Sequence, residues 1–256
     1  MKRFILAFSV SFMALSGTAF ALPQNFGFET GDTTGWTETY PQNFGKIDVV
    51  ADWTGQSTIA GASERWTATY KPVEGNYFAV LETGEPDRDF TMLSQRVSLN
   101  RGDKLEGWAT FCCGSEVYYP YQPIDADNYN DYALISILNS QGNIVDVPWY
   151  ADSFDIGYRV TTSEGQAMGE INKIADFGPL PWEHWSWTAP APDSYTLQYK
   201  VTQGTDAVGN SYAFFDGTKK KAAVPEPSSM ILLGLAGAGV FAARRFSQLN
   251  TGNRLA

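Results

Sequence analysis

Short apolar runs alternate with turn-forming residues along most of the chain, and none of residues 22–217 keeps a helical period. Runs rich in Val, Tyr, Phe, Trp and Thr, separated by Gly, Asn, Asp and Pro, are typical of all-β sandwiches and barrels. We expect strands at Lys46–Ala51, Trp66–Lys71, Tyr77–Glu82, Phe90–Leu99, Lys104–Phe111, Tyr132–Leu138, Ile144–Trp149, Trp185–Thr188, Tyr195–Thr202 and Ser211–Phe215. About ten short strands of this kind predict a two-sheet jelly-roll β-sandwich.

The N-terminal end departs from this pattern. Lys2 and Arg3 precede an apolar run, Phe4–Leu15, and Ala19-Phe20-Ala21 has the small-x-small pattern that a signal peptidase recognises. Charge, length and cleavage pattern all favour a signal peptide over a buried helix. We therefore expect residues 1–21 to be removed on export.

The C-terminal end carries an uncharged apolar run, Met230–Ala243, followed at once by Arg244 and Arg245. This run is somewhat shorter than the roughly 20 residues of a membrane-spanning helix, although two preceding serines can extend it. Two arginines at its end favour a cytoplasmic C-terminus by the positive-inside rule. We expect a transmembrane helix here.

Pro225, Glu226 and Pro227 lie just before this run. Pro-Glu-Pro, a Gly- and Ala-rich apolar helix and an arginine cluster near the C-terminus together resemble the PEP-CTERM sorting signal. In that family an exosortase, a membrane-embedded cysteine peptidase, recognises the signal and is thought to cleave near the Pro-Glu-Pro. The alternative is an ordinary C-terminal membrane anchor.

The resemblance implies a location as well as a partner. The protein would be exported, anchored transiently in the inner membrane, and then held at the cell surface or in the extracellular matrix of a Gram-negative bacterium. The expected parts are a signal peptide (1–21), a β-sandwich domain (22–217), a spacer (218–223), the sorting signal with its helix (224–246) and a cytoplasmic tail (247–256).

The charge of the mature segment limits its partners. Of 18 basic and 28 acidic residues, five basic and one acidic lie outside residues 22–224, which leaves 13 basic, 27 acidic and a formal charge of −14. Such a domain is repelled by nucleic acid and by anionic lipid, and is better suited to calcium or to neutral polymers.

The two cysteines, Cys112 and Cys113, are adjacent. Neighbouring residues of a strand point to opposite faces, so these thiols cannot pair without a distorted turn, which Gly114 would permit. A strained vicinal disulfide, two free thiols and pairing with another molecule all remain open. No CxxC spacing indicates a zinc or redox motif.

Several segments of the mature chain resemble a recurrent domain of PEP-CTERM proteins, a galactose-binding-like sandwich similar to carbohydrate-binding modules. These segments are Asn25–Asp32 with Gly35-Trp36, Gly75–Leu81, Asn130–Ala133, Thr188–Pro190, Ser194–Leu197 and Ser211–Asp216.

That resemblance implies a structural calcium ion where the N-terminal segment meets the last strand. Glu29 and Asp216 would be its side-chain ligands, and Gly31 or Asn76 would give carbonyl oxygens. Alternatively, the two carboxylates only cap turns. A second oxygen-rich cluster lacks the spacing of an EF-hand; its members are Asp125, Asp127, Asn128, Asn130 and Asp131.

Catalytic machinery is not indicated. His184 is the only histidine, and no Gly-x-Ser-x-Gly elbow accompanies it. A glycosidase needs two carboxylates about 5–10 Å apart, but with so many acidic residues that spacing is uninformative. We expect a protein that is not an enzyme.

Aromatic residues suggest where sugar would bind, because sugar rings stack on Tyr and Trp while polar groups contact the hydroxyls. The candidate ligand-binding residues are Tyr118, Tyr119, Tyr121, Trp149 and Tyr150. Five tryptophans are more typical of core packing than of sugar binding; they are Trp36, Trp66, Trp108, Trp185 and Trp187.

The sequence thus favours a non-catalytic carbohydrate-binding module on an exosortase-sorted protein associated with exopolysaccharide. The main alternative is a purely structural or adhesive surface protein without a sugar site, and a polysaccharide-active enzyme comes third.

Overall fold

The computed structural model describes residues 23–40, 45–56, 67–84, 89–113, 131–153, 179–204 and 210–218, all within a compact unit that ends at Thr218. Every regular element in these ranges is a β-strand. No helix in them is long and apolar enough to cross a membrane. The expected signal peptide, spacer residues from Lys219 onward, sorting signal and cytoplasmic tail lie outside the described residues, as do Tyr118, Tyr119, Tyr121 and Trp66.

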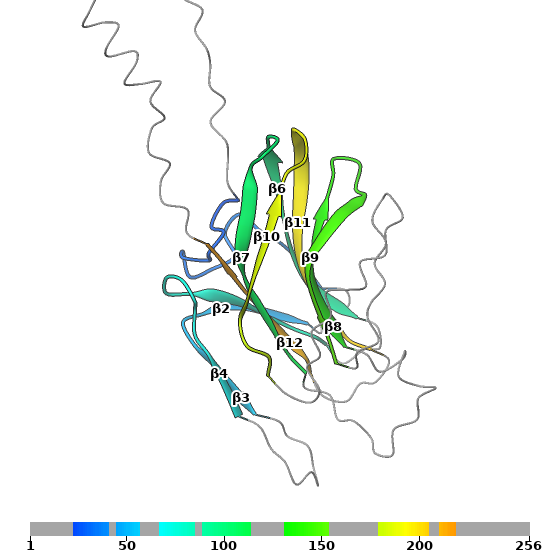
Figure 1. Cartoon of the computed structure of the whole chain (residues 1–256). Helices are drawn as coiled ribbons and strands as arrows, with labels where there is room; N and C mark the ends of the chain where they lie inside the picture. The colour runs from blue at the N-terminus through cyan, green and yellow to red at the C-terminus, as the bar shows by residue number, and fades with distance from the viewer. Residues whose placement is uncertain are drawn as a thin grey trace, which may run out of the picture. The chain divides into compact units, whose positions relative to one another are not determined.

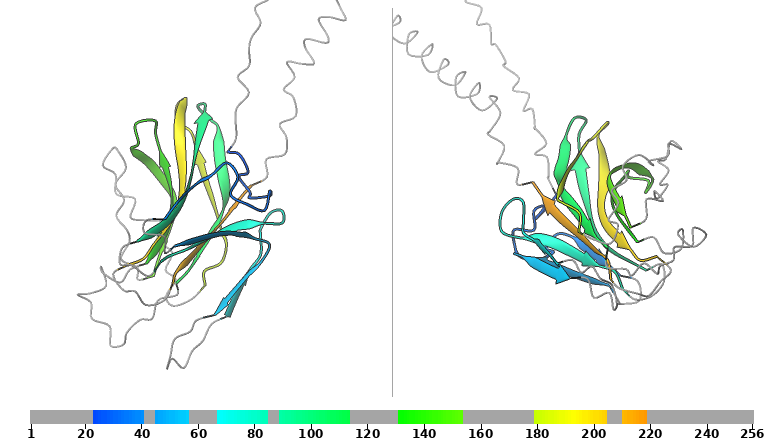
Figure 2. Two further views of the ribbon diagram at one scale, coloured as in Figure 1. Left: turned by 180° about the vertical axis from the view of Figure 1, so that it is seen from behind. Right: turned by 60° about the horizontal axis from the view of Figure 1, so that its bottom comes forward.

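Two five-stranded antiparallel sheets form the body of the domain (Figures 1 and 2). The first sheet has the order β1 (Thr37–Thr39), β6 (Phe90–Leu99), β11 (Asp193–Thr202), β8 (Tyr132–Leu138) and β9 (Ile144–Asp152). The second has the order β10 (Glu183–Thr188), β7 (Lys104–Cys112), β12 (Tyr212–Gly217), β5 (Phe78–Glu82) and β2 (Lys46–Val50). The predicted all-β sandwich is therefore confirmed.

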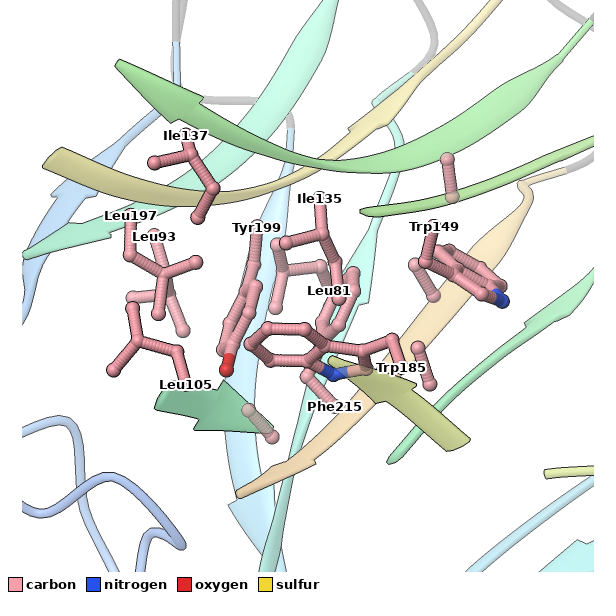
Figure 3. Close-up of a cluster of buried hydrophobic side chains, with 14 of the residues drawn as sticks. Leu81, Leu93, Leu105, Ile135, Ile137, Trp149, Trp185, Leu197, Tyr199 and Phe215 are labelled. Atoms are coloured by element: carbon pink, nitrogen blue, oxygen red, sulfur yellow. The ribbon is translucent and has the colours of Figure 1, made fainter. Parts of the chain in front are cut away.

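The core lies between the two sheets, because alternate residues of each strand point inward. Tyr199 of β11 stacks on Phe215 of β12 with ring centroids 4.4 Å apart, and Trp36 covers the same tyrosine at 4.9 Å. Figure 3 shows this interior, with Trp185 reaching in from the second sheet. Trp36, Trp185 and Trp187 are buried, as predicted, whereas Trp108 is only partly buried.

A small hairpin adds a third layer. Strands β3 (Trp53–Gln56) and β4 (Thr67–Tyr70) pair with each other and pack on the outer face of the second sheet. Tyr70 lies against Phe214 with ring centroids 4.4 Å apart, and its hydroxyl donates a hydrogen bond to the Leu180 carbonyl at 2.6 Å. Burial of this aromatic cluster holds the hairpin on the sheet.

The two cysteines are free, which is the second of the three alternatives that the sequence left open. Cys112 belongs to the cluster beneath the hairpin, while Cys113 belongs to the core between the sheets. The strand continues through Cys112, so the two side chains leave it on opposite faces. Both thiols are buried, which also keeps them from pairing with another molecule in the folded state.

Candidate functional site

Trp149 lies in the core rather than on the surface. It is 2% exposed, and its indole Nε1 donates a hydrogen bond to Glu183 Oε2 at 3.1 Å. Its ring meets Phe215 edge to face at 6.1 Å, in the interior shown in Figure 3. A sugar cannot stack on this ring while the core is intact, so the stacking role predicted for Trp149 is not supported.

Tyr150 points to the opposite face of β9 but is also only 2% exposed. Its hydroxyl donates a hydrogen bond to Asp152 Oδ2 at 2.9 Å, and its ring packs with Leu134 and Val147. Both the hydroxyl and the ring of Tyr150 are engaged in this small buried cluster, so the ring is not accessible for stacking on a sugar.

The outer face of the first sheet is polar and partly exposed along β6 and β11, whereas its β8–β9 side is a buried, largely apolar cluster. On its central strand, β11, the outward positions are Thr196, Gln198 and Lys200. Register places Gln198 between Ser94 and Ser136, and the Ser136 hydroxyl donates a hydrogen bond to Gln198 Oε1 at 3.0 Å. Ser136 is buried, so the partly exposed Ser94 and Gln198 are the members of this row with hydroxyl and amide groups of the kind that contact sugar hydroxyls.

Aromatic rings lie beside this polar row. Register places Thr202 between Phe90 and Tyr132, and both of these rings are partly exposed. Tyr132 stacks on Tyr150 with ring centroids 6.1 Å apart, which fixes its orientation. The part of the Tyr132 ring that stays exposed is apolar surface of the kind on which sugars stack.

Lys200 lies between these rings at the middle of the face. Its Nζ is 4.5 Å from the centroid of the Phe90 ring and 5.9 Å from that of Tyr132. Burial lowers the pKa of Lys200, because the charged form is partly withdrawn from water. None of the described carboxylates forms an ion pair with this ammonium.

Sequence reasoning missed Phe90, Tyr132, Gln198 and Lys200 as one surface. Alternating polar positions in β11 were the available signal. Residues 90, 132 and 200 become neighbours only through the pairing of three strands, which the alternation alone does not fix.

Asp216 is the first of the two predicted calcium ligands. Its Oδ2 accepts hydrogen bonds from the backbone N–H groups of Val73 and Glu74 at 2.8 and 2.9 Å. Its Oδ1 is buried and has no hydrogen-bond partner. The pKa of Asp216 is raised to about 7, chiefly by burial and in smaller part by the nearby carboxylates of Glu29 and Glu74, against the lowering effect of those two hydrogen bonds.

Glu29, the second predicted ligand, reaches the same turn. Its Oε1 accepts a hydrogen bond from the Asn76 backbone N–H at 3.0 Å, and Oε2 accepts one from the Asn76 side-chain amide at 3.3 Å. Asn76 thus acts here as a donor to the carboxylate. Gly75, at φ +83°, makes the approach possible, since a Cβ there would lie 1.8 Å from Glu29 Oε1.

The N-terminal segment and the last strand do lie together, as the resemblance implied. A Cβ on Gly27 would lie 2.8 Å from the Gly217 carbonyl oxygen. The described residues contain no group of three or more Asp, Glu, His or Cys side chains that could hold a metal. Two carboxylates, one of which has an unpartnered buried oxygen, fit part of a calcium shell, so backbone carbonyls and water would have to complete it.

Comparison with known proteins identifies the C-terminal segment. Residues 223–245 match the model of the PEP-CTERM protein-sorting motif, as the sequence predicted. No curated protein matches the chain.

Among solved structures, the chain is similar to TmCBM61 in complex with β-1,4-galactotriose, at 14% identity and a TM-score of 0.37, covering 78% of this chain and 95% of that one. It is also similar to the CBM22-1 xylan-binding domain of Paenibacillus barcinonensis Xyn10C (14%, TM-score 0.30, coverage 77% and 94%). A third is the K3 cleaved adhesin domain of Lys-gingipain from Porphyromonas gingivalis W83 (12%, TM-score 0.36, coverage 78% and 99%). The chain therefore carries a PEP-CTERM protein-sorting motif behind an all-β sandwich.

Proposed function

We propose that this protein is an exosortase-processed surface or extracellular-matrix protein whose sandwich binds polysaccharide without catalysing a reaction. The PEP-CTERM motif marks an exported protein that is processed at the membrane. In this proposal the polymer is the exopolysaccharide of the same Gram-negative bacterium, and anchoring in the inner membrane is transient.

One observation carries the binding function: the outer face of the first sheet combines partly exposed rings with hydroxyl and amide groups. Tyr132 and Phe90 supply the ring faces, and Gln198 supplies an amide held by Ser136. Stacking on fixed rings with hydrogen bonds beside them is how proteins recognise sugars. The surface is a sheet face on rigid strands, so it needs little ordering when polymer binds.

The Tyr118–Tyr121 segment remains a second candidate contact. It belongs to the stretch between Cys113 and Asp131, which leads directly into β8 and Tyr132. In the proposal, its tyrosines are further stacking residues for the polymer. Calcium at Glu29 and Asp216 would then have a structural role, since that turn lies between the N-terminal segment and the second sheet.

The direct test is retention of the full-length protein, in mild detergent, in gels that contain the exopolysaccharide of the producing strain. We expect retention that is lost in Tyr132→Ala and weakened in Gln198→Ala. Tyr118→Ala and Tyr121→Ala show whether the neighbouring segment contributes. Ser186→Ala, an exposed position on β10 of the second sheet, is the matched control and should behave as wild type.

Wild-type protein that shows no retention would refute the binding function and leave a structural or adhesive role. Retention that survives every change on the first sheet would place the polymer elsewhere on the protein.

A further inference from the structure

Lys200 carries a positive charge on the outer face of β11, the central strand of the first sheet. β11 is paired on one side with β6 and on the other with β8, so Lys200 is as far as possible from a sheet edge. Its direct neighbours across the two ladders are Met92 and Leu134, which offer no charge and no hydrogen bond. The side chain therefore cannot find a counter-charge by turning toward an adjacent strand.

A half-buried ammonium without a carboxylate is unfavourable for the folded protein. The rings of Phe90 and Tyr132 compensate in part, because the negative face of an aromatic ring attracts a cation. The nearest carboxylate in the register, that of Asp152 beside Tyr132, accepts the Tyr150 hydroxyl instead. None of the described residues therefore supplies an anion for the Lys200 ammonium, and an anion from outside the protein could fill this role.

Other lysines of the domain show the contrast. Lys46 pairs with Asp48 at 2.5 Å, and Lys104 pairs with Glu106 at 2.5 Å. Both of these are surface pairs on the second sheet. Lys200 differs from both, because it lies on the central strand of its sheet and has no carboxylate partner among the described residues.

A second cation lies on the same face. Arg96 of β6 is exposed and donates a hydrogen bond from Nε to the Ser194 hydroxyl at 2.6 Å. Lys200 is paired with Met92, four residues from Arg96 along β6, so the two cations stand about 13 Å apart along the strands. An extended polymer lying along β6 and β11 would meet both.

We propose that the outer face of the first sheet binds an acidic polysaccharide, whose sugar carboxylates pair with Lys200 and Arg96 while a sugar ring rests on Tyr132. This inference rests on the proposed polysaccharide-binding function and adds the chemical class of the polymer. The negative charge of the whole domain does not prevent such binding. At physiological ionic strength, carboxylates more than about 8 Å from the bound anion are largely screened, whereas a partly buried pair is screened much less.

The test compares native exopolysaccharide of the producing strain with the same polymer after chemical reduction of its carboxyl groups to alcohols. Binding to full-length protein is measured as the dissociation constant for each polymer. We expect reduction of the carboxyl groups to weaken binding by about tenfold or more, as is typical for loss of a charge-assisted contact. Lys200→Met should weaken binding of the native polymer by a similar factor and leave binding of the reduced polymer nearly unchanged. Lys200→Arg should keep the preference for the native polymer, and Lys104→Met, which removes a lysine already paired with Glu106, should behave as wild type.

Equal binding of both polymers by the wild type, or an undiminished preference in Lys200→Met, would overturn the acidic-polymer inference and leave polysaccharide binding itself intact. Absence of binding to either polymer would refute the proposed function, and this inference with it.

Discussion

Asp216 and Glu29 hold the two ends of one turn. Asp216, on the last strand of the sandwich, accepts the N–H groups of Val73 and Glu74, and Glu29, near the start of the domain, accepts that of Asn76. The first and last parts of the domain are therefore joined through a third segment rather than by a direct bond. Burial of Asp216, with a smaller contribution from the Glu29 carboxylate, raises the pKa of Asp216 and makes the stability of the domain depend on pH.

The stability of the domain should fall as pH rises through the range in which Asp216 ionises. Its pKa is about 7 in the folded protein against 3.8 for an ordinary aspartate, so between these values the folded state binds more protons than the unfolded state. Stability from this group is complete below about pH 4 and is lost as pH rises toward 7, by an amount on the order of a few kcal/mol. Asp216→Asn should remove this dependence.

Urea unfolding of both proteins in calcium-free buffer at pH 4.5 and pH 7.5 measures the effect. Asp193→Asn is a control of opposite sign, since hydrogen bonds from the Ser140 and Ser194 backbone lower the pKa of that exposed aspartate. If the difference in free energy of unfolding between wild type and Asp216→Asn is the same at both pH values, the raised pKa of Asp216 is contradicted.

Calcium should stabilise the wild-type protein at neutral pH. A cation beside the buried Oδ1 of Asp216 would favour the ionised carboxylate that burial otherwise penalises. At a concentration 100 times its dissociation constant, a ligand that binds only the folded state adds about 2.7 kcal/mol, which corresponds to a rise of several degrees in Tm. Thermal unfolding with calcium and with chelator measures this rise.

Glu29→Gln and Asp216→Asn should each abolish the calcium effect. Glu38→Gln, which changes an exposed carboxylate on β1, should retain it. If the two ligand variants respond to calcium as fully as wild type, the ion binds elsewhere.

Replacement of Trp149 should affect stability and leave sugar retention unchanged. Removal of its ring opens a cavity in the core next to Phe215, so Trp149→Ala is expected to lower the free energy of unfolding by about 3–5 kcal/mol. Trp149→Phe keeps most of the buried surface and should cost less, which preserves a folded protein for the binding test. Urea unfolding and gel retention, run on the same samples, separate the two effects. Lost retention in a stable Trp149→Phe protein would show that the indole takes part in binding.

Neither cysteine should react in the folded protein. Burial raises the pKa of the Cys112 thiol far above its usual range, and the neighbouring Cys113 raises it further, so the reactive thiolate is scarce. A thiol reagent should modify no cysteine in native protein and two after unfolding in denaturant, and a reducing agent should leave Tm unchanged. A reducible bond between residues 112 and 113, seen by mass spectrometry, would contradict the structure.

The strands could be predicted because they are apolar runs bounded by turn residues: Phe90–Leu99 alternates between buried and more exposed positions, whereas Tyr132–Leu138 is a nearly continuous buried run. Both bounds of Phe90–Leu99 and of Tyr132–Leu138 agree with the structure, and each of the other predicted strands overlaps an observed one. The missed strands are β1 and β3. Thr37–Thr39 is short and polar, and Trp53–Gln56 has a single large apolar residue, so neither shows the periodicity on which such predictions depend.

The functional face was harder to predict than the strands. Trp149 and Tyr150 follow each other in β9, and the sequence marks both as aromatic, but it does not say which sheet face is covered. Pro148 within the same strand is tolerated because β9 is an edge strand of the first sheet, again a fact of topology. By contrast, the pairing of Glu29 with Asp216 came from a family resemblance and not from any local pattern.

The chain leaves the sandwich from β12, which lies at the centre of the second sheet between β7 and β5. The sorting motif follows a few residues later. Mechanical tension on the tail would therefore act on an interior strand that is bonded along both sides, and both ladders would have to yield before the domain came apart. If the tail followed an edge strand instead, that strand could separate from the sheet one hydrogen bond at a time. Under the proposed function, this attachment would keep the sandwich folded while the tail carries load.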